Sequence, residues 1–318
     1  MFQTLMGIKY VIADEDNVPY GYTLVKGNAK RGIYKNDNVL PLGYSSSHLI
    51  SDEYFNEQDF AGRSELLLKG IVTENTTNSE MELSTKEINL AYDYEGDLNI
   101  KSDNGQYIID VSDETTIELK LKEPFKNRIL FISFDMMKAN KCSDGDTSIT
   151  INGIVNKLTC KQWMYFNDNY RFEYVITDNN EINSLNITFS KGYYVIEDIH
   201  FYELDYANLL NITSNIDKMS IDMSQTKGNV IVGNIDVTED GYFATTIPYD
   251  KGYKIYVNNQ MMEYEMVNEA FIGFPLSKGV YNIKIVYVSP GFNVGRIGSF
   301  IGLMLLVGSI IIEKKKKY

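Results

Sequence analysis

The sequence is poor in the residues that build metal and redox centres, because it holds only two histidines and two cysteines among 318 residues. It is also short of basic residues: 43 acidic against 30 basic side chains give a net charge of −13. A general nucleic-acid binder needs a basic surface for phosphate contacts, so that class is excluded. With 44% apolar and 23% charged residues, the chain is an ordinary folding chain of two or three domains. We expect no cofactor and no nucleic-acid partner.

Motifs that carry catalysis are missing as well. The sequence contains no P-loop and no G-x-G-x-x-G, and residues 43–47 (GYSSS) do not complete G-x-S-x-G. His48 and His200 are far apart, so they form no metal pair. His200 alternates with the apolar Ile199 and Phe201, which favours a structural place in a strand, whereas His48 lies in a polar, solvated segment. The sequence therefore assigns no catalytic residue and no metal ligand.

Acidic clusters are plentiful but uninformative about catalysis. Residues 14–16, 52–53 and 197–198 are typical of solvated faces or helix caps. A hydrolase could use two carboxylates that converge in space, but such convergence is not visible in a sequence. Asp144-Gly145-Asp146 resembles a fragment of a calcium loop and lacks the remaining ligands, so we predict a turn there.

One long uncharged run lies near the C-terminus, at residues 297–312 (IGSFIGLMLLVGSIII). As a helix it would measure about 24 Å, and extension back to Phe292 brings it to the ~30 Å thickness of the hydrocarbon core. The lysines 314–317 follow almost at once, which a buried helix of a soluble protein does not explain. We therefore predict a transmembrane helix over residues 292–312.

The lysines that follow this helix also predict its orientation, because basic residues stay on the cytoplasmic side. Residues 313–318 should lie in the cytoplasm and residues 1–291 outside. Residues 1–16 show neither the basic start nor the long apolar stretch of a signal peptide. We therefore expect this chain to be the C-terminal part of a larger membrane protein.

The glycines of the apolar run predict partners within the membrane. Gly298 and Gly302 fit G-x-x-x-G, a spacing that lets two membrane helices approach closely. We expect this helix to contact the bilayer and other transmembrane helices of the same protein or of a split partner. Chance placement of glycines in an apolar run is the alternative.

The pattern of the residues between these ends predicts β-structure almost throughout. Apolar residues alternate with period two in several segments, such as 117–121, 185–189, 253–257 and 281–287. Asn-Gly, Asn-Asn and Ser-Lys-Gly turn signals separate such segments. Short strands with frequent turns are typical of β-sandwiches of the jelly-roll or immunoglobulin-like kind.

These patterns give a domain plan. Residues 1–72 form a mixed α/β lead segment, with strands around residues 6–13, 20–26 and 32–34 and a helix from Ser51 to about Ile71. A first sandwich follows at residues 73–205 and a smaller second sandwich at residues 206–291. The transmembrane helix covers residues 292–312, and a basic tail covers residues 313–318.

Two further features concern single residues. Cys142 and Cys160 are close enough in sequence to form a disulfide outside the membrane, and two buried free thiols are the alternative. Trp163, the only tryptophan, lies with Tyr165 in the segment QWMYFN. Aromatic faces beside amides suit a sugar, so Trp163 and Tyr165 are the candidate substrate-binding residues. A core tryptophan with its N–H satisfied is the favoured alternative.

Several short segments follow one another in a distinctive order. They are residues 5–12 (LMGIKYVI), 19–22 (PYGY), 32–36 (GIYKN), 40–44 (LPLGY), 241–253 (GYFATTIPYDKGY), 271–276 (FIGFPL) and 290–291 (PG). No single segment is specific, but their order along nearly the whole chain resembles the extracellular part of the YfhO family of bacterial membrane proteins, with Tyr253 where the family usually has tryptophan. The resemblance implies a location at a bacterial cell membrane.

The resemblance implies a polytopic protein similar to C-type glycosyltransferases, which transfer a sugar from a lipid-phosphate carrier to a cell-envelope polymer such as lipoteichoic acid. In that superfamily the catalytic carboxylates lie between the first membrane helices, which this sequence does not contain. The resemblance therefore implies an extracellular accessory region that guides the acceptor glycan and lacks the active site. A self-contained, membrane-anchored carbohydrate-binding or adhesion protein is the alternative, and a surface hydrolase is a third possibility.

Overall fold

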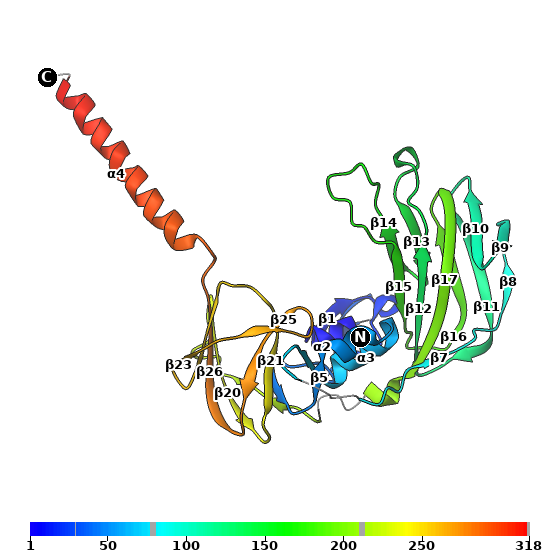
Figure 1. The fold of residues 1–318 in the computed structure, drawn as a ribbon, viewed down its shortest axis with the longest axis horizontal. Helices are drawn as coiled ribbons and strands as arrows, with labels where there is room; N and C mark the ends of the chain where they lie inside the picture. Colours follow the sequence, from blue (N-terminus) through cyan, green and yellow to red (C-terminus); the bar gives the residue numbers. More distant parts are fainter. Residues whose placement is uncertain (29, 77–80, 210–213, 317–318) are drawn as a thin grey trace. The chain divides into compact units, whose positions relative to one another are not determined.

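The computed structural model describes residues 1–28, 30–76, 81–209 and 214–316, and antiparallel β-strands are their main secondary structure (Figure 1). The chain divides into two compact units. The first unit comprises residues 1–40 and 48–215, and the second comprises residues 41–47 and 216–318. The mainly β fold class with β-sandwiches, predicted from the sequence, is confirmed.

Two sheets form the sandwich of the first unit. One sheet has the spatial order β15 (Arg171–Ile176), β12 (Arg128–Met136), β17 (Gly192–Asp205), β10 (Gln106–Val111) and β9 (Ile100–Asp103), with β7 (Lys86–Glu87) also on β17. The other has the order β14 (Ile154–Leu158), β13 (Thr147–Ile151), β16 (Ile182–Phe189), β11 (Thr115–Phe125) and β8 (Tyr92–Glu95). The paired strands are antiparallel throughout both sheets.

The core of this sandwich lies between the two sheets and follows the period-two pattern. Ile117 and Leu119 on β11, and Leu185 and Phe189 on β16, are all less than 9% exposed. Because side chains alternate between the two faces of a strand, every second residue of these strands points into the core. The strands predicted from this alternation are therefore confirmed at these segments.

The opposite face of β12 is covered too. Ile129, Phe131 and Ser133 on that face are at most 1% exposed, although they do not belong to the sandwich core. Phe60 of α3 (Phe60–Lys69) contacts Phe131 edge to face, with ring centroids 5.8 Å apart. The lead segment therefore packs on the sandwich, and β12 is buried on both faces.

The lead segment is mixed α/β, as predicted, but its first strand begins later than expected. A short helix occupies the first residues, and only the end of the predicted strand at residues 6–13 is extended. The elements are α1 (Phe2–Leu5), β1 (Tyr10–Ala13), a 3₁₀ turn η1 (Glu15–Asn17), β2 (Thr23–Asn28), β3 (Arg31–Lys35), and the parallel pair β5 (Leu49–Ser51) and β6 (Ile71–Thr73).

The predicted helix from Ser51 to Ile71 is wrong as a single element. The Ser51 hydroxyl accepts from Tyr54 N and begins α2 (Asp52–Glu57), as its capping role suggested. The Asp59 carboxylate then accepts from Gly62 N at 2.7 Å and begins α3. A second N-cap starts a new helix because its side chain satisfies N–H groups that have no partner in the first turn. The chain is extended from Gly70 and continues as β6.

The second unit is a smaller sandwich. One sheet has the order β18 (Asp217–Lys218), β4 (Gly43–Ser46), β21 (Gly241–Pro248), β25 (Phe271–Leu276) and β24 (Glu265–Val267). The other has the order β19 (Ser220–Ile221), β20 (Val230–Val237), β26 (Gly279–Tyr287), β22 (Tyr253–Val257) and β23 (Gln260–Met262). Strand β4 comes from the segment assigned to the lead, so the chain contributes to this unit before it completes the first. The domain limits derived from the sequence remain a proposal.

Turn residues lie where the sequence placed them. Asn104 and Gly105, both with positive φ, join β9 to β10. Asn258 and Asn259, with φ of 49° and 64°, join β22 to β23. Two consecutive residues with positive φ match the twist of the flanking strands in a tight hairpin, and asparagine and glycine tolerate that conformation.

The C-terminal helix α4 (Phe292–Lys316) is the one helix of the described residues that is long and apolar enough to cross a membrane. Within Phe292–Lys315, an 18-residue window has a mean hydropathy of 2.0, and none of that window is buried within the chain. The helix continues through the lysines beyond the predicted end at residue 312, because lysine is a good helix former.

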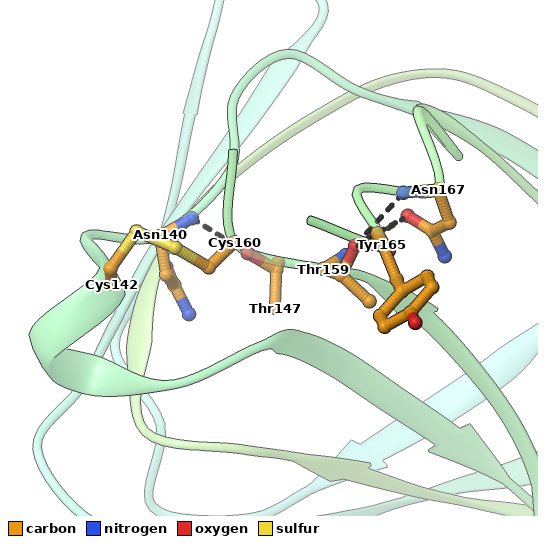
Figure 2. Close-up of a disulfide and its surroundings, with 7 residues drawn as sticks. All are labelled: Asn140, Cys142, Thr147, Thr159, Cys160, Tyr165 and Asn167. Carbon is orange, nitrogen blue, oxygen red and sulfur yellow. Dashed lines mark hydrogen bonds between the residues drawn. A yellow bond between two sulfur atoms is a disulfide. The ribbon is translucent and has the colours of Figure 1, made fainter. Parts of the chain in front are cut away.

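A disulfide joins Cys142 and Cys160, whose Cα atoms lie 5.2 Å apart (Figure 2). Cys142 begins the 3₁₀ turn η2 (Cys142–Asp144), which follows β12, and Cys160 follows β14. This decides between the two alternatives left open by the sequence, a disulfide and two free thiols. The bond ties together two connections that leave opposite sheets of the first sandwich.

Removing this disulfide should destabilise the first unit. Conversion of both residues to alanine (C142A with C160A) should lower the free energy of unfolding by about 3 kcal/mol, because the unfolded chain regains the entropy of a loop of 18 residues. The measurement is thermal unfolding of the full chain in lipid nanodiscs, followed by the fluorescence of Trp163, the only tryptophan. Reductant should shift the wild-type transition and leave that of the double variant unchanged. Equal transitions for reduced and oxidised wild-type protein, with both thiols shown free by alkylation after reduction, would contradict this expectation.

A buried carboxylate in α3 gives a second prediction. Glu65 is fully buried, accepts from Ser84 N and Thr85 N at 3.0 and 2.9 Å, and forms an ion pair with Lys69. Burial alone would raise the pKa of Glu65, but the Lys69 ammonium and the two N–H groups lower it below its usual 4.5. The charged form is thus the stabilising one. Its contribution is fully present above pH 4.5 and is lost as the pH falls through the lower folded pKa.

The substitution Glu65→Gln should therefore cost about 3 kcal/mol at pH 7, because it leaves the Lys69 ammonium without its buried partner. Unfolding by urea at pH 7 and at pH 4 measures this, and the difference between variant and wild type should shrink at the lower pH. Glu57→Gln, at an exposed position at the end of α2, is the matched control and should be near neutral. A loss that stays constant or grows toward low pH would refute the assigned protonation state.

Candidate functional site

The predicted sugar-binding residues lie on the loop between β14 and β15. Trp163 is 54% exposed and Tyr165 is 82% exposed, with Met164 between them at 88%. The favoured interpretation of Trp163 as a core residue is therefore wrong. Its position in a loop, outside the alternation of either flanking strand, explains why it does not join the core.

Polar contacts hold both ends of this loop (Figure 2). Thr159 N donates to Asn167 Oδ1 at 3.0 Å, and Asn167 N donates to Thr159 Oγ1 at 2.9 Å. Asn167 Nδ2 also donates to the carbonyl of Lys157 on β14 at 2.8 Å. These bonds close the base of the loop just beside the disulfide at Cys160. The aromatic side chains are therefore presented from a short connection that is held at its base.

The sequence did not predict a polar hollow on the other side of the disulfide. The hollow has a volume of about 520 Å³ and is lined by three lysines, a tyrosine, two aspartates and neighbouring small or polar residues: Asp110, Val111, Ser112, Lys138, Ala139, Asn140, Lys141, Asp144, Lys191, Gly192 and Tyr193. Three segments distant in sequence form it. The only local sign is the pair of lysines that flanks Ala139-Asn140, and a lysine pair alone is typical of any solvated turn.

Asn140 organises this hollow. Its Nδ2 donates to the carbonyl of Lys191 at 3.1 Å, and its Oδ1 accepts from Tyr193 N at 3.1 Å. Its backbone N–H donates to Thr147 Oγ1 at 2.7 Å, as Figure 2 shows. The Lys138 ammonium lies 4.1 Å from the centre of the Tyr193 ring, within cation–π distance. The hollow thus combines positive charge with an aromatic ring that is 40% exposed.

His200 lies on β17, as expected for a strand residue, and holds two carboxylates. Its Nδ1 is 2.6 Å from Glu87 Oε1 and its Nε2 is 2.9 Å from Asp198 Oδ1. These contacts raise the pKa of His200 above 6.5. His48 is exposed and far from His200 in sequence. Within the described ranges, no group of three or more His, Cys, Asp or Glu residues is placed to hold a metal ion.

Residues of the acidic clusters lie in helix turns and ion pairs that support the fold. Asp52 and Glu53 lie in the first turn of α2, where negative charge is favourable. Asp144 ends the turn η2, and Asp146 forms an ion pair with Lys157 at 3.3 Å. The predicted turn at residues 144–146 is therefore confirmed, with Gly145 at φ +88°.

Comparison with solved structures gives only weak likenesses. A family 29 carbohydrate-binding module aligns with a TM-score of 0.24 and 11% identity, over 37% of this chain and 91% of that one. A CBM32 module produced by Clostridium perfringens aligns with a TM-score of 0.21 and 12% identity, over 38% of this chain and 94% of the module. A Paenibacillus xanthan lyase gives a TM-score of 0.23 and 10% identity, over 63% of this chain and 26% of the lyase. At these scores the likenesses add nothing to the assignment of a site.

Comparison of sequences is more informative. The protein YfhO of Bacillus subtilis (strain 168), which is described as uncharacterized, is 24% identical over 99% of this chain. The chain spans 36% of the length of that relative. The family model described as bacterial membrane protein YfhO matches residues 1–299, which include both sandwiches and the start of α4. The chain therefore belongs to the YfhO family of bacterial membrane proteins.

Proposed function

We propose that this chain is the extracellular accessory region of a polytopic YfhO-family protein and guides an acceptor glycan to transfer chemistry located elsewhere in the protein. The observation that carries the proposal is the exposure of Trp163 and Tyr165 on a loop held at its base. Large exposed aromatic rings on a held loop suit the apolar face of a sugar, because little side-chain freedom is lost when the sugar binds.

The polar hollow supports an acceptor that carries negative charge. Lys138, Lys141 and Lys191 line this hollow next to Cys142, whereas the aromatic loop follows Cys160 at the other end of the disulfide. A polymer with repeated phosphates and sugars, such as lipoteichoic acid, offers partners to both surfaces. Sugars would stack on the aromatic rings, and phosphates would approach the lysines.

The transfer reaction itself is proposed for the part of the protein that this chain does not contain. The resemblance to C-type glycosyltransferases puts the catalytic carboxylates between the first membrane helices, and the chain spans 36% of its relative. The donor in this proposal is a sugar on a lipid-phosphate carrier, and the acceptor is a cell-envelope polymer.

The membrane helix α4 fits the same proposal. Among the described residues, open space lies at the side-chain positions of Gly298 and Gly302, so a partner helix has room to approach there. We propose that another helix of the same protein, or of a split partner, occupies this face. The lysines at its end support a cytoplasmic position for that end and an extracellular position for the sandwiches in this proposal.

A stand-alone membrane-anchored carbohydrate-binding or adhesion protein is the second candidate. The exposed aromatic loop serves such a protein equally well, so glycan binding does not separate the two candidates. Loss of polymer glycosylation in cells that lack the gene favours the first candidate. Normal glycosylation together with loss of surface binding favours the second.

Aromatic substitutions on the loop test the glycan site. Trp163→Ala and Tyr165→Ala should each weaken binding of purified lipoteichoic acid about tenfold, because each removes a stacking ring worth about 0.5–1.5 kcal/mol beyond its buried area. The measurement is calorimetry on the full chain in nanodiscs. Tyr10→Ala, at a ring that is 56% exposed in the lead segment, is the matched control and should leave the affinity unchanged. Equal affinity for all four proteins, or a loss confined to the control, would reject the site.

Labelling of native lysines tests the orientation. A membrane-impermeant, amine-reactive biotin added to intact cells should modify lysines of both sandwiches and spare lysines 314–317, because a positively charged helix end stays in the cytoplasm. Peptide mass spectrometry before and after permeabilisation measures this, and the C-terminal lysines should become labelled only afterwards. Protection of lysines such as Lys101 and Lys254 in intact cells would overturn the extracellular assignment.

A further inference from the structure

A cavity of about 460 Å³ lies between the two sheets of the first sandwich. Its walls are the apolar side chains that face one another across the sandwich, such as Ile117 on β11, Ile132 and Phe134 on β12, and Ile187 on β16. Protein interiors are normally packed as densely as organic crystals. A volume of this size within a sandwich core is in the range of ligand pockets and is much larger than an ordinary packing defect.

The mouth of the cavity lies at one edge of the sandwich. Of the residues that line the cavity, Tyr92, Tyr94, Asn99 and Tyr107 are exposed, and they lie on or between β8, β9 and β10. Strands β8 and β9 are the edge strands of the two opposing sheets and are joined by a short turn. The Tyr94 hydroxyl donates to the carbonyl of Leu98 at 2.9 Å and holds this turn closed. The cavity therefore opens beside a turn that joins the two sheets.

The chemistry of the cavity selects against sugars and charged ligands. Among the described residues that line it, none is charged, and the polar ones are the three tyrosines at the mouth and Asn99. A sugar needs hydrogen-bond partners along its length, and burying its hydroxyl groups without partners is costly. A hydrocarbon chain needs none. It would gain contacts with isoleucine, leucine and phenylalanine that water cannot provide.

Tyrosines at the mouth suit an amphipathic ligand. Tyr92, Tyr94 and Tyr107 line the cavity and are 37–40% exposed, so each lies partly against the apolar space and partly open to solvent. This is the arrangement that tyrosine adopts where an apolar region meets water. We propose that the first sandwich binds one hydrocarbon chain of an amphipathic lipid between its sheets, with the polar head group at the tyrosine rim. The proposal is independent of the glycan site, which lies on other loops.

Photo-crosslinking of the full chain in lipid vesicles tests the proposal. The probe is phosphatidylglycerol with a diazirine near the end of one acyl chain, and tryptic peptides are mapped after irradiation. Crosslinks should appear in peptides that contain β8–β10 and β16, in addition to α4. Labelling of α4 is the internal control, because that helix is apolar enough to contact the acyl chains in any case. Labelling confined to α4 would overturn the proposal.

Variants that fill the cavity make the test specific. Ile100→Trp on β9 and Ile187→Trp on β16 enlarge side chains on opposite walls, and each should reduce labelling of the sandwich at least tenfold while α4 is labelled as before. Lys101→Trp adds the same ring at an exposed neighbour of Ile100 that does not line the cavity, and it should change nothing. Sandwich labelling that persists in both filled variants would place the crosslinks outside the cavity and refute the proposal.

Two further experiments address the source of the bound hydrocarbon chain and the folding of the variants. A soluble diazirine fatty acid, used without labelled phospholipid, shows whether a free acid enters the same peptides; labelling by either probe supports a hydrocarbon site, and labelling by neither opposes it. Resistance of each variant to limited proteolysis reports folding. If both filled variants are degraded, the peptide map of the wild-type protein alone decides. Because this readout uses no glycan, its failure is distinguishable from failure of the proposed glycan function.

Discussion

The long antiparallel ladder between β12 and β17 is the interaction on which the first unit depends. It runs from Arg128 opposite Asp205 to Met136 opposite Ile196, and β15 and β10 pair with its two outer sides. One face of β12 supplies the sandwich core, and the other is covered by α3 through Phe131. Because β12 is buried on both faces, its sequence is a nearly continuous apolar run. The lead segment and the sandwich therefore form one packed body.

The strand ends and one lateral edge of this sandwich are held together in different ways. Beyond the ends of β12 and β14 the connections are tied by the disulfide, with the polar hollow formed in part by residues next to Cys142 and the aromatic loop following Cys160. A covalent bond can hold short polar connections that have little core of their own. At the edge formed by β8 and β9 a short turn joins the two sheets beside the mouth of an apolar cavity. This edge relies on strand pairing and the Tyr94 hydrogen bond, which leaves space between the sheets.

Membership of the YfhO family and the apolar helix α4 join this β-rich region to a membrane. The proposed functions rest on three features of the described residues: exposed rings, a lysine-rich hollow and an apolar cavity. Carboxylates are abundant, and several act as caps or ion-pair partners, such as Asp59 for α3 and Asp146 for Lys157. A region of this kind is suited to present or hold long ligands, and the proposed division of labour leaves the chemistry to the membrane-embedded part.

The sequence alone determined the elements that depend on local pattern: alternating strands such as β11 and β16, asparagine turns, the membrane helix and the family. Each follows from neighbouring side chains or from composition. Only the tertiary structure decided where β4 pairs, because Ser45 and Ser46 are buried without an apolar alternation that predicts it. It also decided that Trp163 is exposed, that lysines from distant segments share a hollow, and that the sandwich core contains a cavity. Burial and proximity of this kind depend on which distant segments meet, and no local pattern encodes that.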